Sequence, residues 1–126
     1  MNTTKQRKIG DEAEALARRL LENKGLRLLE ASYTCFHGEI DLIMQDKEDI
    51  VFVEVRYRTK KDYGDGLESV DRHKMRKLVW TAKHYLLAEG LLYKVNSRFD
   101  IIAVHPAGRG PELEWIVNAF TVDRDL

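Results

Sequence analysis

Apolar residues recur at spacings of three and four in two segments of this chain, residues 10–24 and residues 71–89. This spacing gathers apolar side chains on one face of a helix, so each segment is predicted to form an amphipathic helix. Gly25 and Gly90 follow the two segments, and glycine ends helices because it takes the left-handed conformation without a side-chain clash. The predicted apolar stripes are Ala13, Leu16, Ala17, Leu20 and Leu21, then Met75, Leu78, Val79, Ala82, Tyr85 and Leu86.

Apolar runs between turn signals predict strands in the rest of the chain. They cover residues 26–33, 39–45, 50–58, 98–105 and 113–119. The predicted order is α-β-β-β-α-β-β, an α/β fold in which helices flank a mixed sheet. At 126 residues the chain is too short for two ordinary domains. We therefore expect one domain over residues 1–126, with its core at about 10–105 and an extra C-terminal strand.

The strand at 50–58 begins apolar on both faces, as expected of a strand that is covered on both sides. One face holds Val51, Val53, Val55 and Tyr57, and the other holds Ile50, Phe52, Glu54, Arg56 and Arg58. In the strand at 39–45, one predicted face holds Glu39, Asp41 and Ile43, and the other holds Ile40, Leu42 and Met44. Two acids, Asp41 and Glu54, therefore interrupt strands that are otherwise apolar.

Burying an unpaired charge is costly, so Asp41 and Glu54 need compensation. Arg56 lies two residues after Glu54 on the same face, and one interpretation is an internal ion pair. The other is a divalent cation, because carboxylates on adjacent strands repel one another unless a cation lies between them. A hard ion such as Mg²⁺, or Mn²⁺ in its place, takes oxygen ligands and often uses only one or two protein carboxylates.

Composition excludes several classes of protein. Apolar residues make up 44% of the chain and charged residues 33%, which is typical of a globular domain. No stretch approaches the roughly 20 apolar residues that span a bilayer, so no membrane partner is expected. The segment 1–8 is polar and lacks the apolar core of an export signal, which predicts a cytoplasmic location. The single cysteine, Cys35, agrees with a reducing compartment.

The formal net charge is zero, yet basic residues concentrate between Arg56 and His84. The cluster consists of Arg56, Arg58, Lys60, Lys61, Arg72, Lys74, Arg76, Lys77 and Lys83. One interpretation is an ordinary solvated surface. The alternative is a surface that faces phosphates, since clustered Lys and Arg give backbone affinity for nucleic acid through counterion release. Composition does not choose between them.

Two motifs resemble those of a known superfamily. Gly38-Glu-Ile-Asp-Leu-Ile followed by Val51-Phe-Val-Glu-Val-Arg is similar to the PD-(D/E)xK nucleases, whose restriction-endonuclease-like core is α-β-β-β-α-β. More closely, the pattern from about Gly10 to Val104 resembles the YraN family (UPF0102) of uncharacterised bacterial proteins, which are similar to Holliday-junction resolvases. Besides the two motifs, this resemblance rests on Glu14, Gly25-Leu-Arg-Leu-Leu, Tyr63-Gly64, Val70-x-x-x-Lys74 and Arg98-Phe-Asp-Ile-Ile.

The resemblance implies a role for individual residues. Asp41 and Glu54 would bind the metal, with the backbone carbonyl of Val55 as a third ligand. Arg56 stands where the superfamily usually has its catalytic lysine, and Glu14 corresponds to an acid that resolvase-like members use near the metal. A supporting role falls to Glu39. Contacts to nucleic acid, by implication DNA, are expected from Arg58, Lys60, Lys61, Lys74 and Lys77.

Arg56 is the important departure from the superfamily pattern. An arginine does not lose its proton in practice, so Arg56 could not act as a general base. It could still orient a water or stabilise charge on phosphate oxygens through its planar fork of donors. The chemistry would then rest on Mg²⁺, which activates water for in-line attack on the phosphodiester. A second departure, Ala13 in place of a glycine, is minor.

Three functions remain open at this point. The first is a Mg²⁺-dependent nuclease that acts on structured or branched DNA. The second is a nucleic-acid-binding module that kept the fold and lost the chemistry. The third is an interaction protein with a structural Glu54–Arg56 pair. Resolvase-like enzymes often act as symmetric dimers, so a homodimer is an expectation of the resemblance alone.

Other residues have simpler interpretations. Cys35 and His37 share a turn but fall short of a zinc site. Asp100 is expected to pair with Arg98, and His105 is expected at the surface.

Overall fold

The computed structural model describes residues 3–58 and 71–120. Its elements are α1 (Thr3–Asn23), β1 (Arg27–Cys35), β2 (Gly38–Asp46), β3 (Asp49–Tyr57), α2 (Arg72–Ala88), β4 (Ser97–His105) and β5 (Glu112–Phe120). The predicted order α-β-β-β-α-β-β is confirmed. Helix α1 begins at Thr3 rather than at residue 10. Residues 4–8 are exposed and polar, so they add nothing to the apolar stripe from which the helix was predicted.

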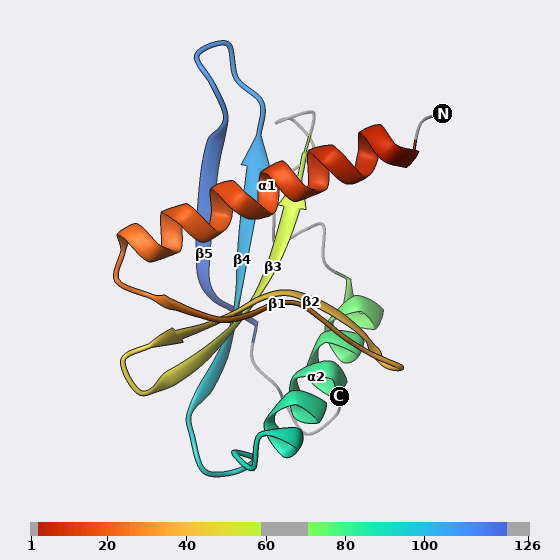
Figure 1. Ribbon diagram of the computed structural model, residues 1–126, viewed down its shortest axis with the longest axis vertical. Coiled ribbons are helices and arrows are strands. Elements are labelled where there is room, and N and C mark those ends of the chain that lie inside the picture. Colours follow the sequence, from red (N-terminus) through yellow and green to blue (C-terminus); the bar gives the residue numbers. More distant parts are fainter. Residues whose placement is uncertain (1–2, 59–70, 121–126) are drawn as a thin grey trace.

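The strands form one mixed sheet in the order β1-β2-β3-β4-β5 (Figure 1). Strands β3 and β4 are parallel, and the other neighbouring pairs are antiparallel. Parallel neighbours need a crossover connection, and α2 lies within the connection between β3 and β4. Neither described helix is long and apolar enough to cross a membrane.

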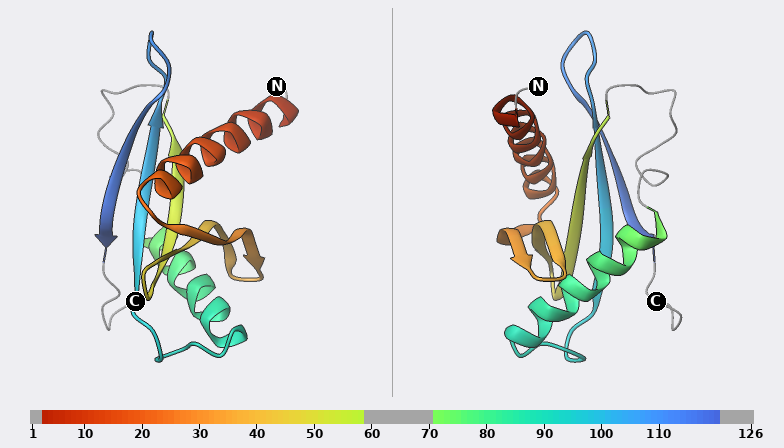
Figure 2. Two further views of the ribbon diagram at one scale, coloured as in Figure 1. Left: turned by 60° about the vertical axis from the view of Figure 1, so that its left-hand side comes forward. Right: turned by 90° about the vertical axis from the view of Figure 1, so that its right-hand side faces the viewer.

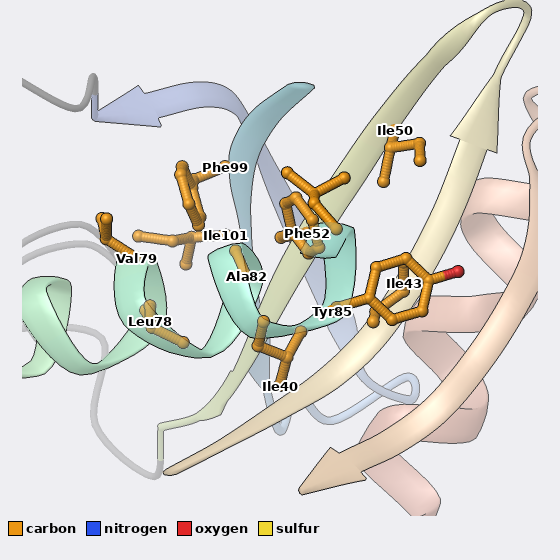
Figure 3. Packing of buried hydrophobic residues seen from close by; sticks show 11 residues of the cluster. Ile40, Ile43, Ile50, Phe52, Leu78, Val79, Ala82, Tyr85, Phe99 and Ile101 are labelled. Atoms are coloured by element: carbon orange, nitrogen blue, oxygen red, sulfur yellow. The ribbon is translucent and has the colours of Figure 1, made fainter. Parts of the chain in front are cut away.

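Each helix covers one face of the sheet (Figure 2). On the α1 side, Ala13, Ala17 and Leu21 pack against Val51 and Val53. On the α2 side, Leu78, Val79, Ala82, Tyr85 and Leu86 pack with Ile50 and Phe52 (Figure 3). The alternation predicted for β3 and the apolar stripes predicted for both helices are therefore confirmed.

The faces predicted for β2 are wrong at one residue. Ile40 packs with Ile43 in the cluster under α2 (Figure 3), whereas Leu42 and Met44 belong to the cluster under α1. Strict alternation holds only in a regular strand, and the pairing of β2 with β3 ends at Leu42–Val53. Beyond that pair, β2 stays with β1 and the hairpin diverges from β3 (Figure 1).

Candidate functional site

The divergence of β2 from β3 opens the place where Asp41 and Glu54 meet. The paired residues of the two strands run from Asp46–Asp49 to Leu42–Val53, and continuing this register would set Asp41 opposite Glu54. Here the side chain of Asp41, and not the backbone of β2, bonds to β3. The backbone N–H of Val55 donates to Oδ2 of Asp41, with 2.8 Å between the two atoms. Asp41 is thereby fixed against β3 beside Glu54.

Glu54 is buried, with 4% of its surface exposed, and two cations neutralise it. Nζ of Lys74 lies 3.2 Å from Oε2 of Glu54, and Nη1 of Arg56 lies 3.3 Å from the same oxygen. The Glu54–Arg56 pair predicted from the strand pattern is therefore present. The Glu54–Lys74 contact was not predicted, because it joins β3 to α2, two elements that only the tertiary structure brings together.

Asp41 is held in an environment that disfavours its charge. Burial raises the pKa of Asp41 to about 8, assisted by the negative charge of Glu54 and by a side-chain hydrogen bond with Glu54. The Val55 N–H acts in the opposite direction and lowers this pKa, while the charge of Glu14 raises it further. Two carboxyl groups this close disfavour a second negative charge, and the contacts of Lys74 and Arg56 are made to Glu54. Without a bound metal ion, the surroundings of Asp41 therefore favour its protonated form at neutral pH.

Glu14 lies in the electrostatic range of this pair, and Glu39 lies in the range of Glu14. Partial burial raises the pKa of Glu14, and the charges of Glu39, Asp11 and Glu54 raise it further. Glu39 is exposed at the start of β2. Within residues 3–58 and 71–120, no three His, Cys, Asp or Glu side chains are grouped to hold a metal ion. The site thus offers two adjacent carboxyls, and Glu14 adds negative potential at Asp41.

The donor set fits a hard divalent ion that keeps most of its waters. Mg²⁺ usually binds through one or two carboxylates and retains several water ligands. Binding of such an ion would displace the proton that Asp41 holds. The hydrogen bond from the Val55 N–H to Asp41 places Val55 beside the pair, and its carbonyl as a third ligand stays a prediction.

Lys74 reaches Glu54 because of how α2 begins. Asp71 caps this helix, and its side chain accepts a hydrogen bond from the backbone N–H of Lys74 at 2.8 Å. This is the usual N-cap arrangement, in which the cap fixes the residue three positions later. Helix α2 carries five basic residues and no acid, namely Arg72, Lys74, Arg76, Lys77 and Lys83.

The other predicted contacts to nucleic acid are distributed as follows. Lys77 is exposed on α2, one turn after Lys74. Arg58 directly follows β3, and its backbone N–H donates to the carbonyl of Val104 at 2.9 Å. Lys60 and Lys61 lie outside the described residues.

Asp100 and His105, both on β4, are buried. Asp100 is buried and pairs with Arg98 as predicted, at 3.0 Å. It also accepts hydrogen bonds from the indole of Trp115 and the backbone N–H of Asn118, so it joins β4 to β5. His105 is buried, contrary to expectation, because it continues the face of β4 that Phe99 and Ile101 present toward α2.

Comparison with known proteins defines the family. The profile of the uncharacterised protein family UPF0102 matches residues 13–104. The chain is 49% identical over 110 residues to a UPF0102 protein of Methylococcus capsulatus, covering 87% of this chain and 88% of that one. It is 43% identical over 121 residues to a UPF0102 protein of Vibrio parahaemolyticus, covering 96% and 98% of the two chains. A UPF0102 protein of Xylella fastidiosa is 48% identical over 119 residues, covering 94% and 96%. The chain therefore belongs to the UPF0102 family, as the sequence predicted. The likeness to nucleases stays a prediction.

Proposed function

We propose that the protein is a divalent-cation-dependent nuclease that acts on structured or branched DNA. The observation that carries this proposal is the Asp41–Glu54 pair. Burial and mutual repulsion raise the pKa of Asp41 to about 8, so the metal-free site holds a proton at neutral pH. Raised pKa values of this kind gather at functional sites, because a purely structural pair gains nothing from two adjacent acids.

The neighbouring groups suit phosphodiester chemistry. A bound Mg²⁺ would supply an activated water and neutralise charge on the phosphate. Asp41, Glu54 and the carbonyl of Val55 would hold the ion. The guanidinium of Arg56, which contacts Glu54, would stabilise charge on phosphate oxygens through its planar fork of donors. Arg56 occupies the position of the usual catalytic lysine, but Lys74 of α2 supplies a lysine ammonium 3.2 Å from Glu54.

The start of α2 favours an anionic partner. The N-terminal end of a helix carries partial positive charge, so acids stabilise it and bases destabilise it. Here the first turns of α2 carry Arg72, Lys74, Arg76 and Lys77 and no acid. The cap Asp71 offsets part of the cost of this arrangement, and nucleic-acid phosphates next to the carboxyl pair would offset more of it. A homodimer would match the two equivalent strands of a branched junction.

Cleavage of labelled branched and linear duplexes tests the proposal. The wild type should cleave with Mg²⁺ or Mn²⁺ and not with EDTA. Asp41→Asn and Glu54→Gln should each lower the rate by about 100-fold or more. Asp46→Asn is the matched control, because Asp46 is an acid of β2 that pairs with Arg98, away from Glu54. Cleavage that survives in both site variants would refute the proposal.

A nucleic-acid-binding module without catalysis is the second candidate. It is favoured by the Lys74 and Arg56 contacts, which already neutralise Glu54. This candidate predicts salt-sensitive DNA binding that neither EDTA nor Asp41→Asn alters, together with no cleavage under any metal.

A further inference from the structure

A stack of rings stands exposed at the turn between β1 and β2. Phe36 is 88% exposed, and its ring centroid lies 3.9 Å from that of His37. His37 in turn stacks on Trp80 of α2, with 5.8 Å between centroids and 24° between planes. Trp80 is itself 48% exposed. Leaving two large rings in water at one place gives up the stabilisation that their burial would provide.

The turn is held against α2 by close backbone approach. A side chain at Gly38 would meet the Thr81 hydroxyl at 3.4 Å and Cβ of Lys77 at 3.8 Å, and the φ of Gly38 is 151°. Thr81 is buried, and its hydroxyl donates to the carbonyl of Lys77 at 2.7 Å. The helix therefore supports Phe36 and His37 from beneath, and the ring of Phe36 is presented outward on a fixed base.

Positive charge surrounds the stack. Nζ of Lys83 lies 4.9 Å from the centroid of the Trp80 ring, and Lys77 lies beside Gly38. Glu39, exposed beside this turn, is the acid that adjoins these lysines, and its charge also raises the pKa of Glu14 on α1. Exposed rings among lysines are the combination with which proteins bind unpaired nucleotides, since bases stack on rings and phosphates contact cations.

We propose that this stack, formed by Phe36, His37 and Trp80, binds unpaired bases of the nucleic acid that the carboxyl site acts on. The inference rests on the proposed function. Phe36 offers the free face on which a base would stack, with Lys77 and Lys83 beside it for the phosphates. Trp80 follows Lys74 by six residues, a rise of about 9 Å along α2, which equals roughly two to three nucleotides of a stacked strand at about 3.4 Å each. The stack would therefore select substrates with unpaired nucleotides near the cleavage point.

A second copy of this chain fits the surface less well. A two-fold interface places the same patch of both copies face to face, so Lys77 and Lys83 of one copy would lie near the lysines of the other. Such juxtaposition opposes association, whereas phosphates are complementary to it.

Equilibrium binding separates the two sites. The probes are a short duplex and the same duplex with a single-stranded thymidine flap, both measured in EDTA so that no cleavage occurs. Phe36→Ala should weaken binding of the flap probe by about 5- to 150-fold, the loss of one base stacked on a ring, and should leave the paired duplex unaffected. Trp80→Ala should also weaken the flap probe. Tyr93→Ala is the matched control, since Tyr93 is 91% exposed and lies beyond the end of α2.

Each result decides the inference. Selective loss of flap binding in Phe36→Ala supports it. Equal affinity of wild type and Phe36→Ala for the flap probe overturns it and leaves the nuclease proposal standing, because cleavage depends on Asp41. If the wild type binds neither probe, the inference is overturned, whereas the nuclease proposal is decided separately by the cleavage assay with Mg²⁺ or Mn²⁺. A wild-type dimer that Phe36→Ala dissociates in sedimentation would identify the stack as a self-association surface and overturn the inference.

Discussion

Asp41→Asn should change how the stability of the metal-free protein depends on pH. Asparagine has the shape of aspartate and keeps an oxygen to accept the Val55 N–H, so the contact that fixes residue 41 to β3 survives. What the substitution removes is the titrating carboxyl. The variant therefore isolates the electrostatic cost of the Asp41–Glu54 pair from its packing.

The expected sign follows from the pKa shift of Asp41. Its pKa is 3.8 in an ordinary environment and about 8 in the folded protein, so between these values the folded state holds a proton that the unfolded state releases. The contribution of Asp41 to stability is thus complete at low pH and is lost as pH rises toward 8. One proton corresponds to a slope of about 1.4 kcal/mol per pH unit, which is the upper limit for this group.

Urea unfolding in EDTA at several values between about pH 5 and pH 7 measures this slope. The free energy of unfolding of Asp41→Asn minus that of the wild type should rise with pH, by up to about 3 kcal/mol over this window. Taking the difference cancels the titration of histidines and other acids. A difference that stays constant across the window would refute the conclusion that the surroundings of Asp41, including Glu54, raise its pKa in the folded protein.

Three further changes test separate parts of the molecule. Asp71→Ala removes the N-cap of α2 and should lower the free energy of unfolding by about 1 kcal/mol in urea titrations; Asp71→Asn, which keeps an acceptor, should lose much less. Asp100→Ala leaves the donors of Arg98, Trp115 and Asn118 without their buried acceptor, and should cost about 3 kcal/mol in the same assay; a loss below about 1 kcal/mol would contradict the role of Asp100 in joining β4 to β5. Lys77→Ala should reduce the slope of log affinity against log salt by about 0.9 in DNA titrations, if Lys77 neutralises one phosphate; an unchanged slope would remove Lys77 from the interface.

The order of elements could be predicted from the sequence because most elements have a buried side. Apolar residues that recur every three to four positions in a helix, or every second position in a strand, report that burial directly, as in the stripe of α1 and the alternation of β3. The first turns of α1 escaped prediction because they are exposed and polar. The side on which Ile40 packs escaped because it depends on where β2 parts from β3, which is a property of the whole sheet.

The candidate site was predictable in part for the same reason. Asp41 and Glu54 stand out as acids within apolar strands, a local signal that needs no tertiary information. The contact of Lys74 with Glu54 depends on the Asp71 cap and on the position of α2 over the sheet, and local pattern contains neither. The outward position of Phe36 is similarly hidden, since an apolar residue in a turn gives no sign of whether it is covered.

The proposed role of Asp41 and Glu54 as metal ligands is decided by measuring the binding of a divalent ion. Mn²⁺, which takes the same oxygen ligands as Mg²⁺, is titrated into the protein by calorimetry near pH 7 in two buffers of different ionisation heat, with and without a branched duplex. The wild type should bind with release of close to one proton per ion, because Asp41 must lose its proton to become a ligand. Asp41→Asn should abolish binding, and Asp46→Asn should retain it. An absence of saturable binding in the wild type with the duplex present, or binding that Asp41→Asn retains, would contradict the account.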